Sequence, residues 1–208
     1  MKRLTFTLSL MAMLLFGHSC SGKKAAELPP LEDGQVVCYE NDSFRLIDQE
    51  TSDTFYIRVQ PKQKDGVAFQ TPENTLLEAI AGNFLVVSEG MGNNRTLIIY
   101  DLQTGEECAK IENFFSGIAP EVEGESAITF FIQEENGTYM VWNSSTEEWE
   151  PNRELIEAMQ NPTLEEAKRS CQDFLSEGVS ISALQKYRID LSDRSVTPLN
   201  EYRWSYTE

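Results

Sequence analysis

The stretch "GNFLVVSEGMGNNRTLIIYDLQTGE" (residues 82–106) contains two apolar runs on either side of the glycine-rich segment "EGMGNN". Both runs are short and rich in Val, Leu, Ile and Tyr, a composition typical of strands. Glycine and asparagine accept the backbone angles of a tight turn between them. The stretch therefore predicts two antiparallel strands, 82–90 and 95–102, joined by a hairpin turn.

Similar short segments recur along the chain from residue 34 onward. In the segment 54–60, for example, Phe55, Ile57 and Val59 alternate with other residues, so they would share one face of a strand. The sequence therefore predicts a mainly β fold with antiparallel strands. Further strands are expected at 43–48, 126–133, 138–143, 185–191 and 200–207.

The segment "EENG" (134–137) separates two of these expected strands. Its Asn136-Gly137 pair is a strong signal for a two-residue hairpin turn, because both residues tolerate positive φ angles. The sequence therefore predicts that the chain reverses here and that the two flanking strands pair with each other.

One segment, residues 152–178, has a helical rather than a β pattern. Thr163 is a suitable N-cap residue, and Glu166 three positions later would complete a capping box. Gly178 suits the end of the segment. We expect two short helices here, inserted in the β domain, with an apolar face that packs on the sheet or docks another protein. That face comprises Leu164, Ala167, Cys171, Phe174 and Leu175.

The stretch 81–111 carries a glycine-bearing turn, a strand and hairpin, a Tyr-Asp-Leu tripeptide at 100–102 and a Thr-Gly-Glu turn at 104–106. This order resembles one blade of a bacterial β-propeller. Residues 123–151 repeat it, with Trp142-Asn143 in place of Tyr-Asp. Fainter copies lie at 32–57 and 178–199, and the glycines that lead the four copies are Gly34, Gly82, Gly124 and Gly178.

These glycines follow one another at intervals of roughly 40 to 55 residues, close to the period of about 40 to 50 residues in propeller blades. The resemblance implies a small or degenerate β-propeller with blade-like hairpins. Propellers typically close with about four blades or more, and the chain has room for four only. Another antiparallel meander or a sandwich of the same hairpins therefore stays open as the alternative.

The N-terminal residues follow the order of a secretory signal peptide. Two basic residues precede an uncharged apolar run at 4–16, which leads to Cys20. The run is shorter than the roughly 20 residues that span a bilayer. This order resembles the lipobox of bacterial lipoproteins, although Gly17 and His18 stand where that family has a Leu-like residue and a small residue.

The lipobox resemblance implies that residues 1–19 are a signal peptide and that Cys20 carries the lipid that anchors the chain in a bacterial membrane. An ordinary signal peptide cut elsewhere is the alternative. Residues 20–33 would form a tether, stiffened by two prolines. Residues 34–208 would form a single mainly β domain with the helical insertion.

The residues directly after the cysteine bear on which membrane face carries the protein. Ser21 is similar to the residue found in lipoproteins that are sent to the outer membrane. Lys23 and Lys24 differ from the acidic residues that suggest export to the cell surface. We therefore expect a lipid-anchored outer-membrane protein that faces the periplasm.

The chain is strongly acidic, with 34 Asp and Glu residues against 17 Lys and Arg residues and a formal net charge of −17. Such a surface repels nucleic-acid phosphates and anionic lipid headgroups. We therefore expect no nucleic-acid partner, and attachment to the membrane through the N-terminal lipid.

Three cysteines follow Cys20, an odd number. An exported compartment permits disulfides, and Cys38 and Cys108 are the candidate pair because both lie in strand-like segments. Alternatively, these two and Cys171 are three buried thiols. No Cys-x-x-Cys motif occurs, so the sequence indicates neither a zinc site nor a thioredoxin-like redox pair.

His18 is the only histidine of the chain and lies inside the signal peptide. A mature chain without histidine has no Ser-His-Asp triad, no Cys-His pair and no His-ligated metal. The glycine-rich segment 89–94 lacks the Lys-Ser/Thr end of a phosphate-binding loop. We expect a protein without catalytic activity, bound metal or cofactor.

The sequence is best interpreted as a non-catalytic binding module of the cell envelope. Two alternatives stay open. One is an accessory subunit of an envelope complex, docked through the helical insertion. The other is a carboxylate-dependent glycan hydrolase, for which no feature selects the required pair of carboxylates. The aromatic candidates for ligand contact are Trp142, Trp149 and Trp204, followed by Tyr39, Phe44 and Tyr202.

Overall fold

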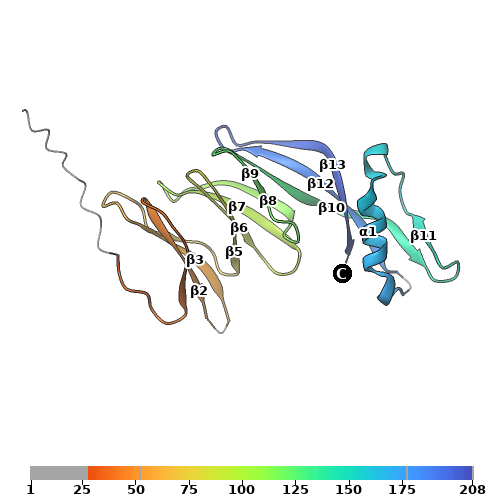
Figure 1. The fold of residues 1–208 in the computed structure, drawn as a ribbon, viewed down its shortest axis with the longest axis horizontal. Helices are drawn as coiled ribbons and strands as arrows, with labels where there is room; N and C mark the ends of the chain where they lie inside the picture. Colours follow the sequence, from red (N-terminus) through yellow and green to blue (C-terminus); the bar gives the residue numbers. More distant parts are fainter. Residues whose placement is uncertain (1–27, 52, 177, 208) are drawn as a thin grey trace, which may run out of the picture.

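A computed structural model describes residues 28–51, 53–176 and 178–207. Within these residues the strands form two antiparallel sheets, one of four strands and one of nine, and a single α-helix lies between the late strands. Figure 1 shows these elements as a row that runs from the first strands to the helix. The predicted mainly β class is therefore confirmed.

The four-stranded sheet is a meander, in which each strand pairs with the next along the chain. Alternation in its second and third strands places Leu46, Ile57 and Val59 on one face, where they are almost fully buried. The strands are β1 (Gln35–Glu40), β2 (Phe44–Glu50), β3 (Phe55–Pro61) and β4 (Phe69–Gln70).

A second meander follows, and it contains the stretch with which the sequence predicts a hairpin. Phe84 lies opposite Asp101 and Glu89 opposite Thr96, with the glycine-rich segment as the turn. The predicted hairpin is therefore confirmed. The strands of this meander are β5 (Thr75–Ala81), β6 (Phe84–Glu89), β7 (Asn94–Asp101) and β8 (Glu107–Phe115).

The third meander is built around a long strand, β10 (Ala127–Asn143). One edge of β10 pairs with β12 (Ser180–Asp190), which pairs in turn with β13 (Ser195–Thr207). The other edge pairs in succession with β9 (Glu121–Glu123), with β8 and with β11 (Glu148–Pro151). The bridge to β8, Ile132 opposite Phe114, joins the second and third meanders into the nine-stranded sheet.

Strand β10 continues through the segment where the sequence predicts a hairpin turn, so that prediction is wrong. Gln133 lies opposite Leu184 and Thr138 opposite Ser182, so both halves of β10 pair with β12 and not with each other. Between these pairs, four residues of β10 (134–137) stand opposite the single residue Ala183, so the pairing is interrupted there. Gly137 permits this interruption, because a Cβ there would lie 2.7 Å from the Glu134 carbonyl oxygen. Long-range pairing has overridden the local turn preference.

The described residues form no closed propeller. The copy expected at 178–199 is not a separate unit, because it supplies β12 and the turn into β13, which complete the third meander after an insertion. The structure therefore has three meanders in a row where the repeat pattern indicates four blades. Of the two architectures that the sequence leaves open, the open antiparallel meander describes these residues.

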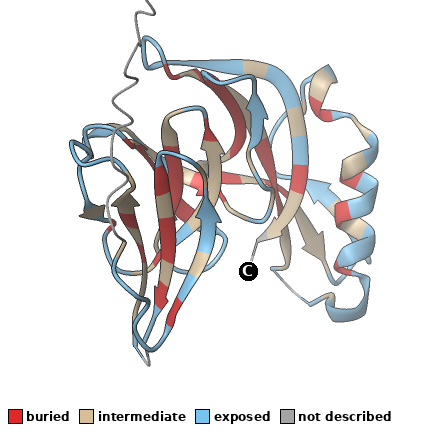
Figure 2. Cartoon of the chain, turned by 60° about the vertical axis from the view of Figure 1, so that its left-hand side comes forward, coloured by how far each residue is buried: buried red, intermediate tan, exposed pale blue. Residues whose placement is uncertain are grey.

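The β6–β7 hairpin lies at the centre of the molecule and is buried on both faces. Its apolar residues are consecutive rather than alternating, as expected for strands covered on both sides. Figure 2 shows buried residues on the strands in the interior of the molecule. One face, with Leu85, Val87, Ile98 and Tyr100, packs on the first meander, and the other, with Val86, Leu97 and Ile99, packs on the third.

The two outermost faces of the row carry polar pairs. On the third meander, Lys186 pairs with Glu121 at 2.9 Å and Arg188 with Glu123 at 2.9 Å. On the first, Gln35 donates a hydrogen bond of 2.7 Å to Gln49, and both side chains are buried.

The insertion between β10 and β12 contains β11, the α-helix α1 (Pro162–Ser170) and two 3₁₀ turns, η1 (Glu157–Met159) and η2 (Gln172–Phe174). The predicted helical segment is thus present, as one α-helix with short flanking turns. The N-cap is Asn161 rather than Thr163, and its side-chain oxygen accepts a hydrogen bond of 3.0 Å from the Thr163 backbone N–H.

The apolar face of α1 packs on the sheet, as one of the two predicted arrangements requires. Leu164 and Ala167 join a cluster with Ile181 and Trp204 of β12 and β13. The Asn161 side chain also donates to the Tyr202 carbonyl at 3.0 Å and thereby fixes the helix to β13. Phe174, expected on the same face, is exposed instead, because the helix ends before it.

Candidate ligand-binding cleft

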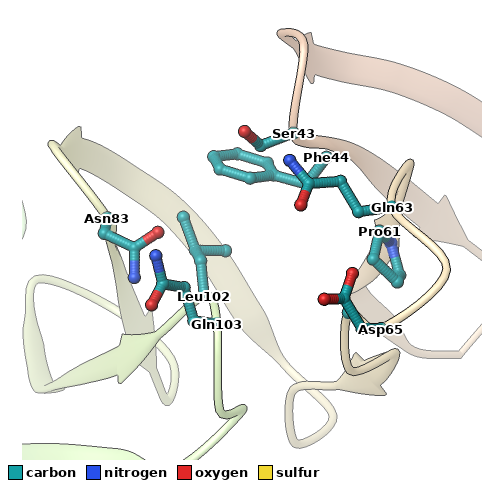
Figure 3. A pocket seen from close by; sticks show the side chains of 9 residues that line it. Ser43, Phe44, Pro61, Gln63, Asp65, Asn83, Leu102 and Gln103 are labelled. Carbon is teal, nitrogen blue, oxygen red and sulfur yellow. The ribbon is translucent and has the colours of Figure 1, made fainter. Parts of the chain in front are cut away.

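A cleft of about 320 Å³ opens between the first and second meanders, at the end of the sheets where their short turns lie. Figure 3 shows Asn83, Leu102 and Gln103 on one wall and the side chains of the first sheet on the other. The turns β1–β2, β3–β4, β5–β6 and β7–β8 all contribute. The lining residues are Ser43, Phe44, Pro61, Gln63, Asp65, Gly66, Asn83, Leu102 and Gln103.

Asp101 organises the wall that belongs to the second meander. Its Oδ1 accepts hydrogen bonds from the Gln103 backbone N–H at 2.7 Å, the Thr104 backbone N–H at 3.1 Å and the Asn83 side-chain amide at 3.1 Å. Gly105 completes this turn with φ +72°. The Tyr-Asp-Leu and Thr-Gly-Glu residues thus form the expected tight turn, and they also hold Asn83 and Gln103 side by side.

Local hydrogen bonds also hold the wall that belongs to the first meander. The Asn41 side chain accepts from the Ser43 N–H at 2.8 Å and the Phe44 N–H at 3.0 Å. The Lys62 N–H donates to the Ser43 carbonyl at 2.8 Å. Gly66 is required, because a Cβ there would lie 2.3 Å from the Pro61 Cβ. Both walls are therefore shaped before any ligand arrives.

The cleft presents side-chain polar groups above an apolar floor. Among the described residues, no hydrogen bond engages the side-chain amides of Gln63 and Gln103 or the hydroxyl of Ser43. Phe44 and Leu102 form the floor and belong to the core cluster between the sheets. Few polar groups placed over apolar residues are the usual make-up of a small-molecule site.

The charge of the cleft is neutral to negative. The lining contains one carboxylate, Asp65, and none of the lining residues is Lys or Arg. The chain as a whole carries a formal net charge of −17. The cleft therefore disfavours anionic ligands, because no cation offsets the repulsion and the desolvation of a bound anion.

The three tryptophans expected to contact a ligand do not form one site. Trp204 is buried, and its indole N–H donates to the Met159 carbonyl at 2.8 Å, so it is a core residue. Trp142 and Trp149 are half-buried cross-strand partners on β10 and β11, with ring centroids 5.6 Å apart. Only this pair stays available for contact with another molecule.

The other three aromatic candidates also lie in different places. Tyr39 is partly exposed and stacks on Phe44 at a centroid distance of 5.9 Å. Phe44 is the one sequence-predicted aromatic that lines the cleft. Tyr202 packs at the edge of the cluster below α1.

An apolar groove of about 550 Å³ runs between α1 and the β10–β11 hairpin. Its apolar lining includes Met140, Pro151, Leu155 and Leu164, and its rim carries Glu165 and Lys168. The groove begins on the strands that carry Trp142 and Trp149.

Cys38, Cys108 and Cys171 are free thiols in the structure, so the disulfide expected between Cys38 and Cys108 is not formed there. The two residues lie in different sheets, on β1 and β8. Cys171 is buried, and burial raises the pKa of its thiol. Cys38 is exposed and Cys108 partly exposed, so the alternative of three buried thiols holds for Cys171 alone.

Burial raises the pKa of two carboxyl groups among the described residues, those of Asp48 and Glu78. They come from different sheets, on β2 and β5, and neither lines the cleft. Glu78 accepts a hydrogen bond of 2.6 Å from the Ser88 hydroxyl. The arrangement does not bring these two groups together across the cleft as a pair of carboxylates.

The sequence analysis did not single out Gln63, Asp65, Asn83 or Gln103. Side chains of this kind are common on surfaces, and nothing in the local pattern shows that two turns 20 residues apart face each other. Asp101 alone pointed to this wall of the cleft, because an aspartate followed closely by Thr-Gly is typical of a tight turn.

Cys20 and the rest of the expected signal peptide lie outside the described residues. Within residues 28–51, 53–176 and 178–207, no helix is long and apolar enough to cross a membrane. The sequence matches no protein-family model, and no curated protein matches it.

Proposed function

We propose that this protein is a lipid-anchored, non-catalytic binding protein of the bacterial cell envelope, with the cleft between the first two meanders as its ligand site. The observation that carries the proposal is the cleft itself. Four turns from two sheets place amide and hydroxyl side chains over an apolar floor, and the turns are held by their own hydrogen bonds.

The anchoring part of the proposal rests on the lipobox-like order that ends at Cys20. A single acyl modification gives only weak membrane attachment, whereas the several chains of a lipoprotein anchor firmly. Ser21, Lys23 and Lys24 support retention at the periplasmic face of the outer membrane. The binding domain would then be tethered by residues 20–33 at a short distance from the bilayer.

The proposal assigns no reaction to the cleft. Asp65 is its one carboxylate, and a glycan hydrolase needs two carboxyl groups on opposite sides of the bond that is cleaved. We therefore propose that this neutral to acidic cleft, lined by amide side chains, binds a ligand and does not catalyse a reaction on it.

We also propose that the three meanders are blades of an open, propeller-like row. The support is the turn chemistry that the second and third meanders share. Asp101 Oδ1 accepts from the backbone N–H two residues later at 2.7 Å, and Asp190 does the same at 3.0 Å. Both aspartates end the third strand of a meander, and Leu102 and Leu191 follow them as buried residues.

The anchoring proposal is tested by fractionation of cells that produce the wild type or Cys20→Ala. We expect the wild type in the membrane fraction and the variant in the soluble fraction. Treatment of intact cells with protease should leave the wild type uncut if it faces the periplasm. A variant that stays in the membrane as firmly as the wild type would contradict the lipid anchor.

The binding part is tested with a low-molecular-weight extract of bacterial envelopes. We expect the extract to shift NMR signals of Gln63, Asn83 and Gln103, and the shift of Asn83 to disappear in Gln63→Ala/Gln103→Ala. Shifts that spare these residues would place the ligand elsewhere and overturn the assignment of the cleft.

A second candidate function, an accessory subunit of an envelope complex, is favoured by the half-buried Trp142–Trp149 pair and the adjoining apolar groove. The matched test is Trp142→Ala against Trp204→Phe in co-purification from detergent-solubilised membranes. Loss of a stoichiometric partner in the first variant alone would support the subunit role.

A further inference from the structure

We infer that the ligand of the cleft is a short neutral saccharide, an inference that rests on the proposed binding function. The cleft volume of about 320 Å³ lies at the small end of the roughly 300–1,000 Å³ typical of small-molecule sites. The size therefore suits a short ligand that fits between two sheets, and the chemistry of the walls defines its class.

The side chains of the cleft match hydroxyl groups. The amides of Gln63 and Gln103 each carry two donors and an acceptor, and the Ser43 hydroxyl donates and accepts. A sugar hydroxyl also donates and accepts at one oxygen, so neighbouring hydroxyls can bond to alternating amide groups. Asn83 adds a carbonyl oxygen and a second N–H, because its amide uses one of its two N–H groups on Asp101 at 3.1 Å.

The floor of the cleft matches the other face of a sugar ring. Phe44, Pro61 and Leu102 present apolar surface between the polar walls. A pyranose ring has polar groups around its edge and carbon-bound hydrogens on its faces. Such a ring can lie with one face on Phe44 and Leu102 while its hydroxyls reach the amides on either side.

The charges of the cleft select a neutral ligand. Asp65 lies on the lining, and no lining residue is cationic. Two lysines of the β3–β4 turn, Lys62 and Lys64, are not among the lining residues, and Lys62 is held by Glu40 at 2.7 Å. Phosphorylated sugars and uronic acids would therefore meet Asp65 without a cation in the lining to offset the repulsion.

An extended peptide is the competing ligand class, and the backbone of the cleft argues against it. Peptides that add to a sheet need unpaired backbone groups on an edge strand. Here the turn backbones are already used, because Lys62 N–H donates to Ser43 O, Gly66 N–H to Gln63 O and Leu102 N–H to Asn83 O. The cleft therefore offers side chains and not a strand edge.

A saccharide in the cleft would touch both sheets and so stabilise their junction. Within the described residues, the first sheet and the nine-stranded sheet share no strand pairing and are held together by the apolar cluster around Leu46 and Leu85. Binding across this junction should therefore raise the unfolding temperature of the first sheet more than that of the rest.

The test is NMR titration of the isotope-labelled protein, residues 20–208 with Cys20→Ser, with maltose, cellobiose and N,N′-diacetylchitobiose. Each is used at about 10 mM, well above the Kd of about 1 mM that corresponds to weak binding. We expect at least one of them to shift the side-chain amide signals of Gln63, Asn83 and Gln103. Glucuronic acid is the charged comparison and should produce no shift.

Substitutions then assign the contacts. Gln103→Ala should weaken binding about three- to tenfold, as expected for one lost hydrogen bond. Gln172→Ala removes an equally exposed amide on η2, far along the chain from the cleft, and should leave the affinity unchanged. An unchanged affinity in both Gln103→Ala and Gln63→Ala would overturn the inference.

The remaining outcomes separate the saccharide inference from the proposed function. Failure of all three neutral saccharides to shift the cleft signals overturns the saccharide assignment. If a short extended peptide or the envelope extract then shifts the same signals, the binding function stands with another ligand class. Saccharide shifts confined to Trp142 and Trp149 would overturn the cleft as the site.

Discussion

The two junctions between consecutive meanders are built differently, although an apolar cluster lies at each of them. At the first junction, side chains around Leu46 and Leu85 make the contact and no strand crosses. At the second, Ile132 pairs with Phe114 and the sheet is continuous. The first junction ends in an open cleft at the turns. At the same end of the second, the Gly82 turn lies directly against the Glu125 backbone.

The difference lies in how neighbouring meanders are held together. The strand pairing at the second junction, Ile132 opposite Phe114, holds β8 and β10 about 4.8 Å apart at that point. Side-chain packing alone allows the sheets to diverge, and the divergence leaves room for a ligand. We therefore expect the first junction, which carries the proposed site, to open more easily than the second.

The largest expected losses of stability come from truncating one buried side chain at each junction. Phe130→Ala at the second junction should cost about 4 kcal/mol and Leu46→Ala at the first about 3 kcal/mol of unfolding free energy. Both residues are at most 1% exposed. The three tryptophans, at 142, 149 and 204, all lie in the third meander and its insertion. Fluorescence therefore reports this part, whereas far-ultraviolet circular dichroism reports every sheet.

In Phe130→Ala the fluorescence and dichroism transitions should shift together in denaturant. In Leu46→Ala the dichroism signal should begin to fall at lower denaturant than the fluorescence, because the first sheet opens by itself. Coincident transitions in Leu46→Ala would show that the first junction is as cooperative as the second.

Two glycines sharpen the comparison at the turn end of the second junction. Gly82 and Gly124 both have positive φ, +55° and +66°. A Cβ on Gly82 would lie 2.5 Å from the Glu125 carbonyl oxygen, whereas one on Gly124 would meet nothing within 4 Å. Gly82→Ala should therefore cost about 3 kcal/mol and Gly124→Ala about 1 kcal/mol. The free energy of unfolding is measured by thermal and chemical denaturation. If both variants lose the same amount, the close contact between Gly82 and Glu125 does not contribute to stability.

Asp101 tests the wall of the cleft. Asp101→Ala removes an acceptor for three hydrogen bonds and should cost about 2 kcal/mol. It should also release the Asn83 side chain and thus weaken any ligand of the cleft. Asp190→Ala removes the corresponding aspartate of the third meander, with a smaller loss and no effect on the ligand. Identical binding by the two variants would contradict the role of Asp101 in shaping the site.

The smallest expected effect is a pH dependence at β5, the strand that lies beside both neighbouring meanders. Burial raises the pKa of Glu78, so the folded state binds this proton more tightly than the unfolded state. The resulting stability is present below the unfolded pKa and is lost as pH rises through the folded pKa. Glu78→Gln should therefore gain stability relative to the wild type as the pH rises from about 4 to about 8.

The control for this effect is Glu106→Gln, an exposed glutamate on the β7–β8 turn. It should follow the wild type at every pH. A difference between Glu78→Gln and the wild type that stays constant with pH would contradict the proton-linked explanation.

Local chemistry made several features of this protein readable from its sequence. The alternation in residues 54–60 and the apolar runs on either side of the glycine-rich segment identify strands, because strand residues point to opposite faces with a period of two. Asp101 and Gly105 identify a turn, because an aspartate side chain and a glycine satisfy its backbone. The helix-forming pattern around Leu164 identified α1 for the same kind of reason.

The features that the sequence missed all depend on partners distant in the chain. Asn136-Gly137 has the preference of a hairpin turn, but β12 offers both halves of β10 a continuous partner. Residues 178–199 resemble the start of a new blade, but their pairing with β10 makes them the end of the third meander.

Signals within about five residues therefore determined several of the strands, the helix and the turn at Asp101, together with the order of residues that leads to Cys20. Only the tertiary structure decided which strands share a sheet, that Trp204 is a core residue, and that Gln63 and Gln103 face each other across a cleft. The physical reason is that strand partners and facing turns are selected by the burial of whole sheets, and that free energy is not encoded in any single segment.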